Sequence, residues 1–380
     1  EVHHLSSTGG AIHYALLSDA KDAGTETTPQ DGALVAAALD SVAQLNERYP
    51  SDDGPLFYFL HRRRHWNPGE GLWMGWERKR GKLVELNRLL RGATDTSFDV
   101  QSSPVPRDVR FVVTLDSDTR LLHGTVRQMI GKIAHPLNRP RFDGAGARVT
   151  GGYGILQPRV TADLPIGSEG SLYQRIFSSQ GGIDPYASAT SDVYQDLFGE
   201  GSFTGKGIYD VDAFQSALDG RVPENTLLSH DLFEGINVRA ALASDIEVVE
   251  DFPSRYDVDM RRRHRWARGD WQLLPWIFGK RGSIPALGRW KMIDNLRRSL
   301  LAPTALLTLF AGWLMSPMVA LIWTTWILVL LALPRLLPLP FGIFPERRGV
   351  TLRSHYVAFG NDILTALEQI GDALRREFAS

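Results

Sequence analysis

Short apolar runs alternate with amphipathic segments over the first two thirds of the chain. The spacing of apolar residues predicts helices, and the alternation of these helices with strands predicts an α/β domain with a mostly parallel sheet. In such a sheet, ligands bind at the carboxyl ends of the strands, where Asp19 and Asp116 lie. The predicted strands are residues 12–17, 56–60, 111–115, 154–156 and 246–249, and the predicted helices are 33–49, 82–90 and 125–134.

A long uncharged stretch follows this region. From Ser299 to Pro334 the chain has no Asp, Glu, Lys or Arg. Because a spanning helix needs ~20 apolar residues, the stretch predicts two short C-terminal transmembrane helices broken near Ser316, with a buried core hairpin as the alternative. Arginines and lysines flank both ends, which favours a hairpin with both ends in the cytoplasm. We expect a catalytic domain over 1–284, interfacial and transmembrane helices over 285–345, and an amphipathic cytoplasmic segment over 346–380 that leads to an absent domain.

Composition narrows the possible functions. The 380 residues are 43% hydrophobic, as in an ordinary folded protein, and the formal net charge of -1 gives no general attraction to nucleic acid. The lack of cysteine excludes disulfides, zinc–thiolate sites and cysteine nucleophiles. Because the chain begins at Glu1 without an initiator methionine or a signal peptide, we expect it to be part of a longer protein.

Two carboxylates follow the predicted strand at 111–115. The spacing of Asp116 and Asp118 lets both reach one divalent cation, and Mg²⁺ typically combines one or two carboxylates with substrate phosphates. The pair therefore predicts a metal that holds a diphosphate leaving group, although a solvated turn is the plainer alternative. A haloacid-dehalogenase-like phosphatase is another alternative, with Asp116 as nucleophile and Asp118 as general acid. Those enzymes usually continue Gly-Thr, whereas Thr119 follows Asp118 directly.

Two later segments fit sugar transfer. Asp231, in Ser229-His230-Asp231, precedes an apolar helical stretch and suits either a helix cap or the base that deprotonates an acceptor hydroxyl. Arg262, Arg265 and Trp266 then combine cations that can neutralise a departing diphosphate with an aromatic face that can stack on a sugar ring. These features favour a transferase over a phosphatase.

Four segments carry a specific resemblance that covers nearly the whole chain. They are HRRRHWNPGEGLWMGWERKRGKLVELNRLL, GILQPRV, GEGSFTGKGIYDVDAF and RRRHRWARGDWQ. The order of the motifs resembles that in processive family 2 glycosyltransferases such as cellulose synthase. The amino-acid sequence of the four segments most resembles the glycosyltransferase domain of cyclic β-1,2-glucan synthases, family 84. The resemblance implies a GT-A-like, Rossmann-like fold whose first nucleotide-binding strand would precede Asp19 and be missing here.

The resemblance also implies roles for individual residues. Asp19 would contact uridine, Asp231 would be the base, and Asp116 and Asp118 would bind Mg²⁺ or Mn²⁺. Near the nucleotide and diphosphate it places Lys79, Gly81 and Lys82 together with Asp116. Arg262, Arg265 and Trp266 stand where processive enzymes carry Gln-x-x-Arg-Trp, so arginine replaces glutamine at position 262. The spacing from Gly81 to Asn87 is wider than in cellulose synthases.

The implied reaction is inverting transfer of glucose from UDP-glucose to a growing β-1,2-glucan that is linked to a tyrosine of the protein itself. A processive β-glucan synthase of another linkage is the alternative. Tyr186, which follows Asp184-Pro185 in a glycine-rich turn, is preferred as the attachment site over Tyr173 and Tyr194. Residues 199–206 lack phosphate-loop spacing and are interpreted as an acceptor-side loop. The implied partners are the glucan, the lipid bilayer, and cyclisation and phosphorylase-like domains of the same polypeptide, at the cytoplasmic face of a bacterial inner membrane.

Overall fold

The computed structural model describes residues 1–7, 11–144, 148–163, 170–171, 173–174, 192–228, 230–279, 284–337 and 339–342, with short stretches between 353 and 370. The chain divides into two compact units. The first comprises Glu1–Ala162, Gly181–Asp251 and Phe278–Gly288, and the second comprises Asp163–Gln180, Phe252–Ile277 and Arg289–Ser380. Tyr186 and most of the segment 346–380 lie outside the described residues.

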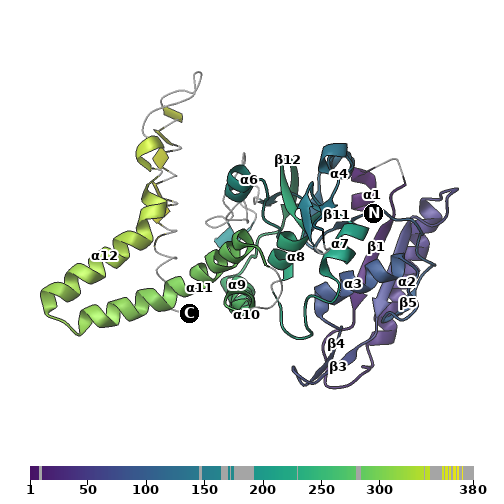
Figure 1. The fold of residues 1–380 in the computed structure, drawn as a ribbon, viewed down its shortest axis with the longest axis horizontal. Coiled ribbons are helices and arrows are strands. Elements are labelled where there is room, and N and C mark those ends of the chain that lie inside the picture. The colour runs from purple at the N-terminus through teal and green to yellow at the C-terminus, as the bar shows by residue number, and fades with distance from the viewer. Residues whose placement is uncertain are drawn as a thin grey trace. The chain divides into compact units, whose positions relative to one another are not determined.

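A three-stranded sheet begins the first unit. Strand β1 runs parallel to β2, and β5 pairs with β2 in the antiparallel sense. Helix α2 lies along this sheet (Figure 1) and packs Val42 against Phe57 and Phe59, so the predicted helix and both predicted strands are present. The bounds are α1 (Val2–Ser6), β1 (Tyr14–Asp19), α2 (Asp31–Arg48), β2 (Phe57–Arg62), the hairpin β3 (His65–Asn67) and β4 (Leu72–Met74), and β5 (Phe98–Gln101).

A five-stranded sheet in the order β6-β11-β10-β12-β7 forms the rest of this unit. Among these strands only β10 and β12 pair in parallel, so the prediction of a mostly parallel sheet is wrong. The prediction missed β7 and β11, and both pair only in the antiparallel sense. Strands of three and four residues are too short for a clear period of two. The bounds are β6 (Phe111–Thr114), β7 (Thr119–Leu121), β10 (Ile155–Ala162), β11 (Gly207–Asp210) and β12 (Ala240–Glu250), with the small pair β8 (Arg141–Phe142) and β9 (Val149–Gly151) beside them in sequence.

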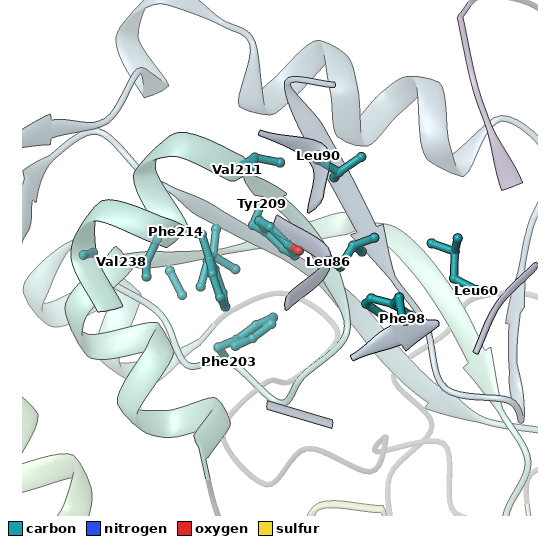
Figure 2. Packing of buried hydrophobic residues seen from close by; sticks show 12 residues of the cluster. Leu60, Leu86, Leu90, Phe98, Phe203, Tyr209, Val211, Phe214 and Val238 are labelled. Atoms are coloured by element: carbon teal, nitrogen blue, oxygen red, sulfur yellow. The ribbon is translucent and has the colours of Figure 1, made fainter. Parts of the chain in front are cut away.

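The largest core cluster joins helices to this sheet. Figure 2 shows Tyr209 of β11 and Phe214 of α7 close to Leu86 of α3, and their burial removes large apolar surfaces from water. Asn87, also on α3, is buried and accepts a hydrogen bond from the Tyr209 hydroxyl at 2.8 Å. The core therefore holds α3 against the sheet by one face. The helices of this unit are α3 (Arg78–Leu90), α4 (Thr125–Ile133), η1 (Pro136–Asn138), α6 (Val193–Phe198), α7 (Val211–Leu218) and α8 (His230–Val238).

Long helices dominate the C-terminal part of the chain (Figure 1). They are α9 (Tyr256–Gln272), α10 (Leu274–Ile277), α11 (Ala286–Trp313) and α12 (Pro317–Leu336), followed by η2 (Leu339–Gly342). In the part of the chain that the structure describes, no helix combines the length and the apolar character needed to cross a membrane, so the predicted transmembrane helices are wrong. The uncharged run extends over two helices and the turn between them. The first half of α11 is charged, so only Ser299 to Trp313 of this helix belong to the uncharged run. At ~1.5 Å per residue, these residues form a helical segment about 22 Å long.

Candidate active site

Two lysines converge on Asp116, which follows β6. Lys79 Nζ, from the first turn of α3, lies 2.6 Å from Asp116 Oδ1, and Lys206 Nζ lies 3.2 Å from Oδ2. Lys206 immediately precedes β11, which pairs with β6, so the sheet brings the lysine to the aspartate. Burial acts to raise the pKa of Asp116, but the charges of Lys79 and Lys206 outweigh it and lower the pKa. Asp116 is therefore a stable anion at neutral pH.

Asp116, Asp118 and Glu250 form a cluster of three carboxylates. Each offers an oxygen, and these oxygens lie within 4.8 Å of one another. Glu250 is the last residue of β12 and pairs with Thr119 of β7, which places it beside Asp118. Hard oxygen donors of this kind fit Mg²⁺ or Mn²⁺, so the residues present suit the predicted metal.

Lys206 and Glu250 are site residues that the sequence interpretation missed. Lys206 Nζ lies 2.9 Å from Glu250 Oε2, and both side chains are buried. Burial acts to lower the pKa of Lys206, but Glu250 and Asp116 outweigh it and raise the pKa, so the side chain stays charged. Lys206 is the last residue of GEGSFTGK, which the sequence alone suggests to be an acceptor-side loop. As a lone lysine among small residues, it carried a signal that could have identified it as a fixed cation.

Asp19 belongs to a second set of charges. Arg62 is fully buried and donates from Nε to Asp19 Oδ1 at 2.6 Å and from Nη1 to Glu85 Oε2 at 2.8 Å. Lys82 Nζ lies 2.8 Å from Asp19 Oδ2. Asp19, predicted to contact uridine, thus has both carboxylate oxygens engaged by cations of the protein.

Helix α3 connects the two sets of charges. Two consecutive residues in the left-handed region mark its start: Glu77, just before the helix, at φ 49°, and Arg78, its first residue, at φ 51°. A side chain at Gly81 would come within 2.1 Å of the carbonyl oxygen of Trp76, so glycine permits this close approach. The same helix then presents Lys79 to Asp116 and Lys82 to Asp19.

Asp231 lies in the first turn of α8, next to Gly205. A Cβ atom on Gly205, whose φ is +83°, would lie 2.6 Å from Asp231 Oδ1, so the backbone of Gly205 packs against this carboxylate. The carbonyl oxygen of the same glycine accepts a hydrogen bond from Lys79 Nζ at 3.0 Å. Gly205 therefore brings the predicted base and the Asp116 site together, from positions far apart in sequence.

The buried His230 precedes this aspartate. His230 Nδ1 lies 2.9 Å from Glu234 Oε1 and 3.3 Å from Asp231 Oδ1. Burial acts to lower the pKa of His230, but the charges of Glu234 and Asp231 outweigh it and raise the pKa to about 9. Ser229, the first residue of the predicted motif, lies outside the described residues.

Helix α9 of the second unit carries the arginine–tryptophan motif. The guanidinium group of Arg262 lies 4.9 Å from the Trp266 ring centroid and donates to Asp259 Oδ1 at 2.9 Å. Asp259 has no exposed surface, and it also accepts from Arg263 at 2.7 Å. Arg262 is thus held within its own helix, whereas Arg265 is exposed and Trp266 keeps 44% of its surface exposed.

The candidate tyrosines differ in accessibility. The Tyr173 hydroxyl donates to Asp259 Oδ2 at 2.8 Å, and Tyr194 is buried with 6% of its surface exposed. The Tyr173 hydroxyl is engaged by Asp259 and the Tyr194 side chain is buried, so neither fits the free, exposed hydroxyl that an attachment site requires. Tyr186, the preferred candidate, lies outside the described residues.

The fold and these contacts define a class: an α/β protein with an acidic, lysine-lined site beyond its strand ends, suited to a metal-bound diphosphate. The chain is homologous over its whole length to one segment of a cyclic β-(1,2)-glucan synthase, which confirms the resemblance predicted from its motifs. It is 52% identical over 379 residues to "Cyclic beta-(1,2)-glucan synthase NdvB" of Rhizobium meliloti (strain 1021), and it spans 13% of the length of that relative. No protein-family model matches the chain.

Proposed function

We propose that this chain is the glycosyltransferase part of a cyclic β-1,2-glucan synthase and that it transfers glucose from UDP-glucose with inversion. The observation that carries the proposal is the contact at Gly205, which places the Asp231 carboxylate beside the Lys79–Asp116 pair. A base for the acceptor and a site for the leaving diphosphate then lie within one cluster, as a single displacement requires. The identity to a glucan synthase supports the choice of sugar and linkage.

The leaving-group side would be held by carboxylates and lysines. Asp116, Asp118 and Glu250 would hold a divalent metal, which supplies Lewis-acid stabilisation of the negative charge that develops on UDP. Lys79 and Lys206 add two fixed positive charges at Asp116. Because these ammonium groups are already oriented by carboxylates, little reorganisation is needed when the diphosphate departs.

On the acceptor side, Asp231 would take the proton from the 2-hydroxyl of the terminal glucose. The hydroxyl oxygen then forms a bond to the anomeric carbon as the bond from that carbon to the UDP oxygen breaks. One displacement inverts the configuration, so an α-linked donor gives a β-linkage. The proton ends on Asp231, and the electron pair of the broken bond leaves with UDP.

The family motif that helix α9 carries, rather than its place in the fold, assigns it a part in the reaction. Exposed Arg265 suits the departing diphosphate, and the exposed face of Trp266 suits stacking on a glucose ring. Arg262 stacks on Trp266 and is anchored by Asp259, so we assign it to orienting the tryptophan. Cyclisation and length control are assigned to other parts of the longer polypeptide.

The transfer assay tests this function directly. Full-length protein is incubated with radiolabelled UDP-glucose and Mg²⁺ or Mn²⁺, and β-1,2-linked label is measured with and without a chelator. We expect chelation to abolish incorporation and Asp116→Asn to lower it at least about 100-fold, since the metal loses a carboxylate and the site an anion. Undiminished incorporation with the chelator would contradict the metal assignment, and no incorporation by the wild type under any condition would contradict the function.

The glucan attachment site has its own test. We propose Tyr186 because the Tyr173 hydroxyl is engaged by Asp259 and the Tyr194 side chain is buried. In the labelled assay, Tyr186→Phe should eliminate the protein-bound radioactive band seen on a denaturing gel, whereas Tyr173→Phe should retain it. A band that persists in Tyr186→Phe moves the attachment to another tyrosine.

A further inference from the structure

A buried cluster of charges at the start of α8 assigns a role to a residue that the proposed reaction does not use. We propose that His230, in contact with Glu234, is a positioning residue that fixes the carboxylate of the base Asp231. The inference rests on the proposed function, because Asp231 acts as a base only if the chain transfers sugar.

The geometry of α8 places the three side chains together. Glu234 lies four residues after His230, so both project from one face of the helix. His230 is 8% exposed and Glu234 is 2% exposed, and they are joined by the 2.9 Å contact at Nδ1. Glu234 Oε2 is buried and has no hydrogen-bond partner among the described residues. A buried carboxylate with so few partners is costly unless a positive charge lies beside it, and His230 supplies that charge.

The positive charge on His230 distinguishes this cluster from a metal site. His230, Asp231 and Glu234 bring ligand atoms within 4.8 Å of one another, so their spacing alone would suit a cation. The charged groups that face the histidine are Glu234 and Asp231, which favour its protonated form, and Lys79, which opposes it. Since the net effect is a pKa of about 9, the ring carries a proton at neutral pH, and a metal ion could bind it only by displacing that proton.

Asp231 is thus confined between two neighbours. Gly205 packs against its carboxylate on one side, and the imidazolium of His230 lies 3.3 Å from Oδ1 on another. Asp231 Oδ1 is buried and receives no hydrogen bond from the described residues, whereas the side chain as a whole is 35% exposed, so a bound sugar can reach the exposed part of the carboxylate.

The test measures activity against pH in the full-length protein. His230→Gln keeps a donor for Glu234 but removes the charge, and we expect kcat to fall about tenfold, less than the ~10²–10⁴-fold loss expected for removing the base itself. KM for UDP-glucose should not change. In Glu234→Gln, the pH above which activity falls should be lower than in the wild type by at least about one unit. Without the negative charge of Glu234, His230 loses its proton at a lower pH. His230→Lys, which restores a charge, should recover part of kcat.

The exposed His123 provides a matched control, since His123→Gln should leave both kcat and the pH profile unchanged. Wild-type kcat in His230→Gln, or an alkaline limit that does not move in Glu234→Gln, would overturn the proposal. A lower kcat that His230→Lys does not raise would also overturn it, since that result indicates a structural role.

A second readout does not depend on catalysis. The folded-state pKa of His230 is raised from 6.5 to about 9, so its contribution to stability is fully present below pH ~6.5 and is lost as pH rises through ~9. The difference in Tm between wild type and His230→Gln should therefore shrink between these pH values. A pH-independent difference contradicts the charged cluster, whereas a wild type that shows this trend without transferring glucose contradicts only the proposed function.

Discussion

Asp231→Asn is expected to lower glucose transfer by a factor of ~10²–10⁴ while leaving UDP-glucose binding unchanged. Asparagine has nearly the size and shape of aspartate, so it fits against the backbone of Gly205. It cannot accept the proton of the attacking hydroxyl, so the barrier to transfer rises while ground-state contacts remain. The measurement is the initial rate of label incorporation from UDP-glucose together with the Kd for UDP from equilibrium dialysis.

Asp212→Asn is the control for this prediction. The Asp212 side chain is 73% exposed and pairs with Arg91 at the surface, so its charge is screened and its loss should leave the rate within about twofold. A transfer rate for Asp231→Asn within a few-fold of wild type would mean that another group removes the proton. A Kd for UDP weakened as much as the rate would instead place Asp231 in donor binding.

Arg62→Met is expected to lower the free energy of unfolding by ~3–5 kcal/mol. Arg62 is fully buried between Asp19 and Glu85 and also donates to the carbonyl oxygens of Trp76 and Arg78. Methionine fills a similar volume but leaves two carboxylates without their shared cation. The loss would be measured by urea denaturation followed by tryptophan fluorescence.

The adjacent residue provides a matched control. Arg63 is exposed, and Arg63→Met should change the unfolding free energy by no more than ~0.5 kcal/mol. Equal effects of the two substitutions would show that burial of the charge is not the cause. Because Arg62 orients Asp19, the variant that still folds should also bind UDP less tightly if Asp19 contacts uridine.

The site residues that could be predicted from sequence lie next to one strand or helix that the sequence pattern itself identifies. Asp116 and Asp118 follow an apolar strand, and the pattern identified β1, β2 and β6 as short apolar runs and α3 by its helical spacing of apolar residues. Glu250 could not be predicted, since it reaches Asp118 only through the pairing of β12 with β7. Lys206 reaches Asp116 in the same way, through the pairing of β11 with β6.

The predicted membrane segment failed for a related reason. The predicted break near Ser316 is present, but α11 begins in charged sequence before the uncharged run starts, so only the second half of that helix belongs to the run. Helix boundaries depend on packing that composition does not report. Ala305, Leu309 and Ile327 form a small cluster that joins α11 to α12, a contact that hydropathy alone could not reveal.

The loop before β11 has a further consequence for the proposed reaction, because two adjacent residues would serve its opposite ends. Gly205 packs against Asp231, while Lys206 contacts Asp116 and Glu250. In the proposed reaction, an acceptor that displaced the loop would also alter the charge around the donor, so the two substrates would be thermodynamically coupled. By reciprocity, a bound nucleotide changes the affinity for the glucan end by the same factor as the glucan end changes that for the nucleotide. Such coupling would favour rapid successive additions over release of an unfinished chain.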